Sequence, residues 1–273
     1  MVAVDGTLVA SGSLRNGVDT GGASFEAAVW RSEDGARWTQ ADLPGVVLQP
    51  GYRDESNAGS LAVSGDRLLA GGSLSGRAAI WSSTDAGASW TRIDSPGIAE
   101  LSQVSGLVAD GSTVVVSGSV KGSESGSRIL RSTDGGTTYA VASDQPTADG
   151  EGYGPLWAGG GHFFTVGRPG FEGLEDPAAC YVDVDSCSYG GESDVTLVFA
   201  SDDADRWSVL DLSSTDAADA IIGLAGDASG RTLVAHVDEG IVVSAWTADA
   251  ELPEGAVPAA PERVDLVLSL IHI

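Results

Sequence analysis

The 273-residue sequence carries 39 Asp and Glu against 14 Lys and Arg, for a formal net charge of −25. A surface this acidic repels phosphate groups, which excludes nucleic acids and anionic membrane surfaces as expected partners. No apolar run is long enough for membrane insertion, and the first residues lack the basic and apolar regions of a signal peptide, so we expect the chain to begin inside a structural unit, its signal peptide lost by truncation.

Pairs of short apolar runs joined by tight turns recur along the chain. They read MVAV-DG-TLVASG, SLAV-SGD-RLLAGG, GLVA-DGS-TVVVSG and LWA-GGG-HFFTVG. Two runs separated by Asp-Gly or a glycine cluster predict a β-hairpin, because such turns need positive φ angles. A third apolar run and a short alternating run follow each pair. Each unit is therefore predicted to hold four strands, A to D, and a weaker fifth unit follows from IIGLAG onward.

A phrase of the form Ser-x-Asp, ending in an aromatic residue, joins the third and fourth runs of each unit. It reads SEDGARW, STDAGASW, STDGGTTY and SDDADRW, at intervals of about 50 residues that lengthen before the last copy. Four strands per unit at this period are typical of a β-propeller. We predict an all-β propeller in one domain, 1–267, with blades at about 1–43, 59–95, 104–143, 154–212 and 220–253, as part of a larger ring.

The physical reading of the phrase is a self-contained turn. Its Asp accepts backbone N–H groups, its Gly supplies a left-handed conformation, and its aromatic ring seals the gap to a neighbouring sheet. The phrase resembles the Asp box, or BNR repeat, of sialidases, sortilin-type receptors and many secreted bacterial propellers. The resemblance rests on Ser32, Asp34, Gly35, Trp38; Ser83, Asp85, Gly87, Trp90; Ser132, Asp134, Gly136, Tyr139; and Ser201, Asp203, Trp207, with Asp205 where Gly is expected. In those families the box is structural, which implies no catalytic function for these residues.

Ligands are expected on the opposite face, formed by the B–C loops and the D–A connections. The longest B–C loop runs from Arg168 to about Asp194 and holds Cys180 and Cys187. These cysteines predict a disulfide, with two free thiols or half of a metal site as alternatives. The acidic residues of this loop either bind Ca²⁺ or form a solvated acidic surface; their spacing matches no known calcium loop, so we assign no metal or cofactor.

Aromatic and charged side chains on that face are candidates for binding a glycan, peptide or protein, with ordinary loop residues as the alternative. The candidates are Tyr52, Arg53, Asp54, Glu55, Glu151, Tyr153, Arg168, Phe171, Glu172 and Tyr181. His162 and His236 lie in apolar strand contexts and are expected in the core or at an interface between sheets.

Two classes of function remain open. The first is a secreted or cell-surface binding scaffold. The alternative is a sialidase-like glycoside hydrolase, active or degenerate. Resemblance to sialidases implies three arginines, a Tyr–Glu pair, an acid and an Arg-Ile-Pro motif before the first box, and this sequence lacks that motif. We therefore assign no catalytic residue. The final LSLIHI, residues 268–273, resembles a translated sequencing adapter; a genuine final strand is the alternative.

Overall fold

Four-stranded antiparallel sheets recur along the chain, as the hairpin signals predict. The computed structural model describes residues 1–16, 24–46, 56–122, 126–143, 145, 153–167, 197–210, 221–226, 231–237, 241–247 and 262–264. Within these residues it contains five such sheets, each built from strands that are consecutive in the sequence. The predicted all-β class is confirmed, and a short helix, α1 (Pro96–Ala99), adds one turn.

The sheets are named in chain order. Sheet 1 contains β1 (Val2–Val4), β2 (Thr7–Asn16), β3 (Ser24–Ser32) and β4 (Thr39–Ala41). Sheet 2 contains β5 (Asn57–Ser64), β6 (Arg67–Leu74), β7 (Arg77–Ser83) and β8 (Thr91–Arg92). Sheet 3 contains β9 (Leu101–Asp110), β10 (Thr113–Val120), β11 (Ser127–Ser132) and β12 (Ala140–Val141). Sheet 4 contains β13 (Tyr153–Gly159), β14 (His162–Gly167), β15 (Leu197–Ser201) and β16 (Ser208–Leu210). Sheet 5 contains β17 (Ile221–Gly226), β18 (Arg231–Val237), β19 (Ile241–Thr247) and β20 (Glu262–Val264).

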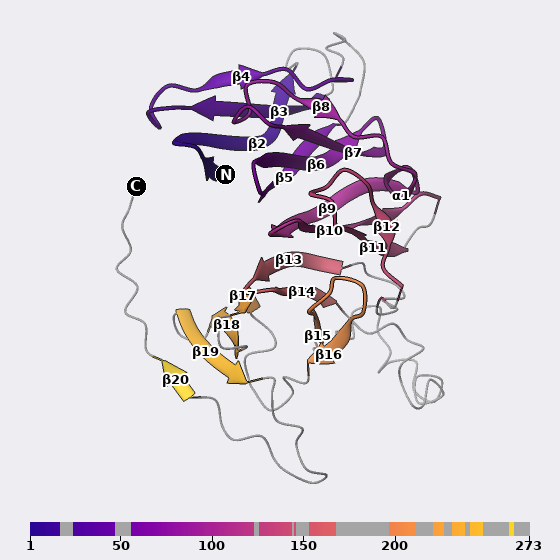
Figure 1. Cartoon of the computed structure of the whole chain (residues 1–273). Coiled ribbons are helices and arrows are strands. Elements are labelled where there is room, and N and C mark those ends of the chain that lie inside the picture. The colour runs from indigo at the N-terminus through magenta and orange to yellow at the C-terminus, as the bar shows by residue number, and fades with distance from the viewer. Residues whose placement is uncertain are drawn as a thin grey trace, which may run out of the picture.

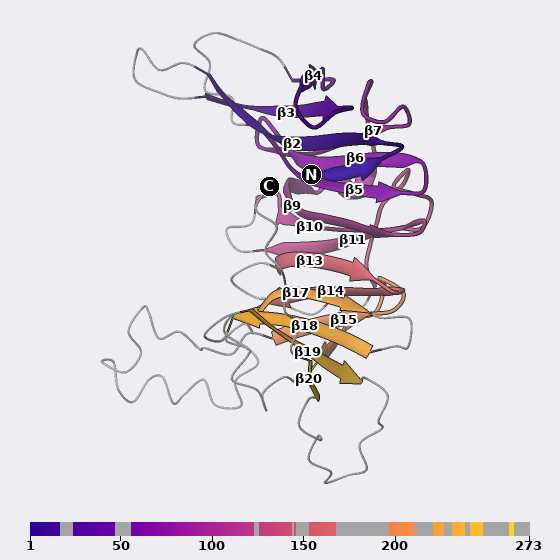
Figure 2. The ribbon, with the colours of Figure 1, turned by 90° about the vertical axis from the view of Figure 1, so that its left-hand side faces the viewer.

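The sheets follow one another along an arc (Figure 1). Their first strands β5, β9, β13 and β17 lie along its inner side, where each contacts the next. Figure 2 shows the same sheets from the side, stacked in chain order. Because every sheet is antiparallel, the A–B and C–D turns lie at one end of the strands, and the B–C and D–A connections lie at the other.

The A–B hairpins of sheets 1 and 4 are tight because both of their turn residues adopt left-handed conformations. Asp5 and Gly6 have φ angles of 48° and 75°, and Gly160 and Gly161 have angles of 66° and 87°. Two successive residues with positive φ match the right-handed twist of the flanking strands. Asp-Gly and Gly-Gly supply this conformation with little strain, so the turns fix which residues pair across each hairpin.

The hydrophobic core lies between the sheets. One cluster joins sheets 1 and 2, including Val9, Val29, Leu68 and Trp81. A second joins sheets 2 and 3 through Leu69, Ile80, Val116 and Leu130. A third joins sheets 3 and 4 through Val115, Ile129, Phe163 and Phe199. Neighbouring residues of one strand thus face different clusters, which is why the strands read as continuous apolar runs.

The last strand of sheet 5 differs from the sequence prediction. We expected the fifth unit to end at about residue 253, but β20 lies at Glu262–Val264 and pairs with β19. The stretch TADAELP, which starts at the last residue of β19, has Asp249 but no Gly or aromatic residue, so it gave no signal for the fourth strand. Among the described residues, no helix has the length and apolar character needed to cross a membrane.

Candidate functional site

The turn between β7 and β8 is closed by hydrogen bonds from its own residues. Asp85 accepts the Ser89 backbone N–H at 2.9 Å, the Ser89 hydroxyl at 2.6 Å and the Ser83 hydroxyl at 2.8 Å. The Ser83 hydroxyl also accepts the Gly87 N–H at 2.9 Å. The Trp90 indole donates to the Gly87 carbonyl at 3.1 Å. The carboxylate, the hydroxyl and the indole are therefore all used to hold this turn.

The C–D turns of sheets 1, 3 and 4 contain the same kind of network. Asp134 accepts the backbone N–H groups of Thr137 and Thr138, both at 2.9 Å. In the shorter copies, Asp34 accepts the Arg37 N–H at 2.7 Å, and Asp203 accepts the Arg206 N–H at 2.8 Å. We call these four segments, 32–38, 83–90, 132–139 and 201–207, the Ser-x-Asp turns.

The left-handed position of the last Ser-x-Asp turn differs from our expectation. Sequence comparison placed Asp205 where Gly is expected, but the residue with a positive φ is Ala204, at 60°. Ala204 occupies the place of Gly35, whose φ is 72°. Its methyl group is fully buried in the cluster between sheets 3 and 4. Packing there offsets a conformation that is unfavourable for alanine.

The hydrogen bonds lower the pKa values of the turn carboxyls. The Ser89 hydroxyl and amide, followed by the Ser83 hydroxyl, lower the pKa of Asp85 to about 2. For Asp134, partial burial acts to raise the pKa, but the Thr138 and Ser132 hydrogen bonds outweigh it and the pKa is about 2. Backbone N–H groups likewise lower the pKa of Asp34 and of Asp203. All four groups are held as carboxylates, the form that accepts the most hydrogen bonds.

We expect Asp85→Ala to lower the free energy of unfolding by about 1–2 kcal/mol, because the Ser89 N–H and the Ser83 hydroxyl lose their acceptor. The cost is moderate because water reaches this exposed turn. Denaturant unfolding measures the change. Asp42→Ala is the matched control, since Asp42 is exposed and has no hydrogen bond among the described residues. Equal losses from the two substitutions would contradict the turn-closing function of Asp85.

Stability is expected to fall as the pH drops from about 4 to about 2. Asp85 and Asp134 have folded-state pKa values of about 2, below the ordinary value of 3.8. A carboxyl with a depressed pKa adds stability above its unfolded-state value, and that stability is lost as pH falls through the folded-state value. The double variant Asp85→Asn, Asp134→Asn should show a flatter decline over this range in denaturant unfolding series. If the free energy of unfolding of the double variant fell with pH as steeply as that of the unsubstituted chain, Asp85 and Asp134 would not be the source of the pH dependence.

The aromatic residue of three Ser-x-Asp turns is buried against the preceding sheet. Trp90, Tyr139 and Trp207 are 6%, 6% and 8% exposed and belong to the clusters between sheets. Burial raises the pKa of Tyr139 well above its ordinary value. Trp38 differs, because its ring is 39% exposed. We expected the aromatic residue of each Ser-x-Asp turn to fill the gap between two sheets. This expectation is wrong for Trp38, because no described sheet precedes sheet 1.

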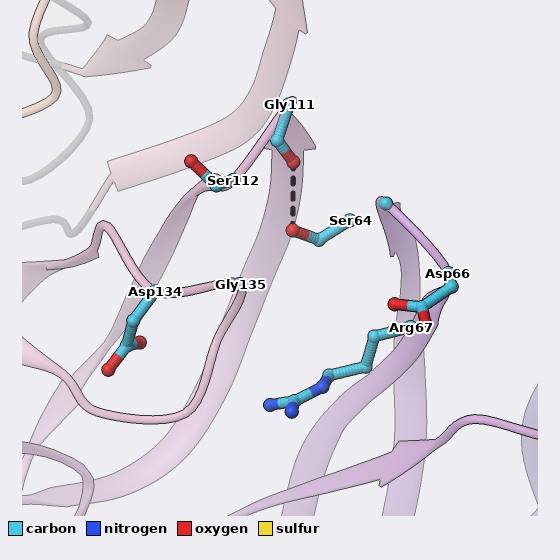
Figure 3. A pocket seen from close by; sticks show the side chains of 8 residues that line it. Ser64, Asp66, Arg67, Gly111, Ser112, Asp134 and Gly135 are labelled. Atoms are coloured by element: carbon cyan, nitrogen blue, oxygen red, sulfur yellow. Dashed lines mark hydrogen bonds between the residues drawn. The ribbon is translucent and has the colours of Figure 1, made fainter.

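Small hollows accompany the turns. One of about 270 Å³ lies between sheets 2 and 3, with Asp66 and Arg67 on one side and Ser112 and Asp134 on the other (Figure 3). Its polar groups are used across the seam: the Ser64 hydroxyl donates to the Gly111 carbonyl at 2.8 Å, and Arg67 donates to Thr137 at 2.7 Å. Another, of about 310 Å³, lies beside Asp34. The first hollow therefore belongs to the contact between two neighbouring sheets, and we assign it a structural part.

The predicted ligand-binding residues fall almost entirely outside the described residues. This holds for Tyr52, Arg53, Asp54, Glu55, Glu151, Arg168, Phe171, Glu172 and Tyr181, and for Cys180 and Cys187. Tyr153 is described: it begins β13, is 7% exposed in the cluster between sheets 3 and 4, and burial raises its pKa to about 12. Its ring is a core group in this state, and its contact with a ligand stays a prediction.

Several titratable side chains in the described part of the chain lie in pairs at the surface. His162 was expected in the core or at an interface, but its side chain is 26% exposed and lies 2.6 Å from Asp202 beside the last Ser-x-Asp turn. Arg131 pairs with Asp205 at 3.1 Å across the seam of sheets 3 and 4. Within the described ranges, no three His, Cys, Asp or Glu side chains come together in a way that could hold a metal ion.

The sequence matches no family model and no curated protein. Among solved structures, the chain is similar to a Trypanosoma rangeli sialidase, with 16% identity, a TM-score of 0.52, and coverage of 90% of this chain and 46% of the sialidase. It is also similar to YCF48 bound to D1 peptide (13% identity, TM-score 0.47, covering 89% and 69%) and to a GH74 enzyme of Niastella koreensis (18%, 0.44, 81% and 28%). The chain spans less than half the length of the sialidase and GH74 chains. The fold is a β-propeller, and the sheets are its blades.

Proposed function

We propose that this chain is a binding module, secreted or at the cell surface, whose B–C and D–A connections present a recognition surface to a glycan, peptide or protein. The observation that carries the proposal is the connection between β14 and β15. These strands pair directly, with Gly167 opposite Leu197, yet residues 168–196 lie between them in the sequence. In blade 2 the same connection needs only Ser75 and Gly76. The pairing of β14 with β15 does not need this added length, and long connections of this kind are usually functional.

The chemistry of this connection suits recognition of polar ligands. It carries Phe171 and Tyr181 for stacking, Arg168 for carboxylates, and Glu172 for hydroxyl groups. We further propose that Cys180 and Cys187 form a disulfide within it, which restricts the loop and lowers the entropy lost on binding. The Ser-x-Asp turns, at the other end of the strands, use their carboxylates internally. We therefore propose that they are structural Asp boxes with no part in binding.

The test replaces residues 168–196 by the Ser-Gly turn of blade 2 and compares both chains on glycan and peptide arrays. We expect the shortened chain to keep its denaturant midpoint and to lose array binding. Arg37→Ala is the matched control, because Arg37 is exposed at the opposite end of the strands. Unchanged binding by the shortened chain would refute the proposal. Turnover of a fluorogenic sialoside that Arg53→Ala abolishes would favour a sialidase-like enzyme instead.

A further inference from the structure

Glu26 is a buried acidic residue in the hairpin formed by β2 and β3. The strands of this hairpin have ten and nine residues, whereas β6 and β7, the equivalent strands of blade 2, have eight and seven. The added length lies at the end of the strands that carries the B–C and D–A connections, which we call the recognition end, and it projects past the neighbouring sheet (Figure 2). Glu26 lies at the base of this extension, directly opposite Leu14.

The carboxyl group of Glu26 is buried without a partner. The residue is 8% exposed, and among the described residues nothing forms a hydrogen bond with its buried Oε2 atom. Its neighbours on the same face of the hairpin are apolar, because Leu14 lies opposite and Ala28 follows two positions later. Protonation does not resolve this, since a protonated oxygen would in turn need an acceptor.

The backbone on both sides of Glu26 is held in place by Ser56. The Ser56 backbone N–H donates to the Phe25 carbonyl at 2.8 Å, and the Ala27 N–H donates to the Ser56 hydroxyl at 2.9 Å. Ser56 is itself buried and comes directly before β5, so the start of blade 2 fixes this part of β3. A carboxylate on such a fixed backbone loses little further freedom when it binds a ligand.

The equivalent position in blade 2 shows that the fold does not require this burial. Leu74 lies opposite Arg77 in blade 2, as Leu14 lies opposite Glu26 in blade 1. Arg77 is exposed even though blade 1 stands beside blade 2. The position therefore lies at the recognition end and outside the contact between blades. A buried carboxyl there is particular to the longer hairpin of blade 1.

The missing partner is best supplied by a cation. An unpaired carboxylate in apolar surroundings destabilises the folded chain, and a cationic donor offsets this through charged hydrogen bonds. The net charge of −25 attracts cationic partners to the whole chain. Because Glu26 is 8% exposed, the cation must arrive on a narrow stem. Lysine and arginine have such an aliphatic stem, whereas an amino sugar carries its ammonium group directly on a broad ring.

We propose that Glu26 accepts a lysine or arginine side chain of a basic peptide, whose aliphatic stem packs against Leu14. The inference rests on the proposed binding function and narrows its ligand to a cationic polypeptide. Residue-specific recognition then takes place at the base of the projecting hairpin, in addition to the long connection between β14 and β15.

The experiment measures binding of a fluorescein-labelled peptide of alternating glycine and lysine by fluorescence anisotropy, at fixed ionic strength. We expect Glu26→Gln to weaken binding at least about tenfold, because a charged hydrogen bond is lost. Glu33→Gln is the matched control, since it removes the same charge from an exposed residue just beyond the other end of β3. It should change binding by less than about twofold. The same peptide with acetylated lysines should bind the unsubstituted chain at least about tenfold more weakly.

Glu26→Met gives a second measurement, because methionine has a similar length and no charge. Its denaturant midpoint should exceed that of the unsubstituted chain, since an unpaired buried charge is removed. The lysine peptide should raise the midpoint of the unsubstituted chain and leave that of Glu26→Met unchanged.

Equal affinity of Glu26→Gln and Glu33→Gln for the lysine peptide would overturn the inference. A lowered midpoint of Glu26→Met would also overturn it, because the carboxylate would then have a partner within the chain. So would a glucosamine oligomer that binds in a Glu26-dependent way when the lysine peptide does not. If the chain without residues 168–196 loses array binding while Glu26→Gln binds the lysine peptide normally, the proposed function stands and this inference alone fails.

Discussion

Replacing Trp90 by alanine is expected to lower the free energy of unfolding by about 3–5 kcal/mol. The indole is 6% exposed, packs with Val9 and Leu68 between blades 1 and 2, and donates to the Gly87 carbonyl at 3.1 Å. Removing it leaves a cavity at the seam and also an unpaired carbonyl. Denaturant unfolding followed by circular dichroism measures the loss.

Trp38→Ala is the matched control for this result. Trp38 has the same place in its Ser-x-Asp turn and makes the same indole bond, to the Gly35 carbonyl at 3.3 Å, but its ring is 39% exposed. Its removal should cost about 1 kcal/mol or less, because little surface is returned to water. If the two alanine variants lost similar amounts, the inter-blade packing of Trp90 would not be the source of its contribution.

Gly72→Ala is expected to destabilise the chain by about 3 kcal/mol or more, an unusually large cost for one added methyl group. A Cβ at Gly72 would lie 2.0 Å from the Asn57 carbonyl oxygen and 2.6 Å from Asn57 Oδ1. The cause is the irregular register of β5, where pairing with β6 shifts between Asn57 and Ser60 and brings the Asn57 backbone over Gly72. Backbone atoms cannot move aside as a side-chain end does, so the hairpin itself must distort.

Gly12 offers the comparison, since it holds the equivalent place in blade 1. A Cβ there would meet only the Trp30 ring at 3.7 Å, an ordinary contact. β1 is short and pairs with β2 only from Val2 to Val4, so no backbone crosses Gly12. Gly12→Ala should therefore change stability by less than about 1 kcal/mol, since alanine also restricts the unfolded chain. Thermal unfolding measures the loss of stability in both variants. If Gly72→Ala cost no more than Gly12→Ala, β5 would be able to move away from Gly72.

The fold was predictable from sequence because its signals are local. Asp-Gly and Gly-Gly turns, apolar runs and the Ser-x-Asp phrase each act within a few residues, so the four-stranded units could be placed to within a few positions. β20 was missed because residues 248–261 separate it from β19 and no phrase announces it. The left-handed position of the last turn was assigned to Asp205 and not to Ala204, because nothing in the sequence distinguishes an alanine with a positive φ from other alanines.

Burial at the seams was not predictable, because it depends on which blade stands beside each residue. Trp38 and Trp90 end nearly identical phrases, and Gly12 and Gly72 end nearly identical runs, yet each pair differs in its surroundings. The geometry of the proposed recognition surface is even harder to predict from sequence. Its candidate residues belong to long connections without a repeated pattern, so their identity suggests chemistry but not geometry.

Among the residues whose burial is described, each inter-blade cluster joins two blades that are adjacent in the chain. Such a molecule behaves as a linear series of units coupled to nearest neighbours, whose total stability is approximately a sum of unit and interface contributions. Duplication of one unit would then create a new interface of the existing kind and leave the others unchanged. For this reason, gain or loss of a blade by duplication or deletion in the gene is a small evolutionary step in this architecture. The four Ser-x-Asp turns share a sequence pattern but differ in length, as expected of duplicated units that have since diverged.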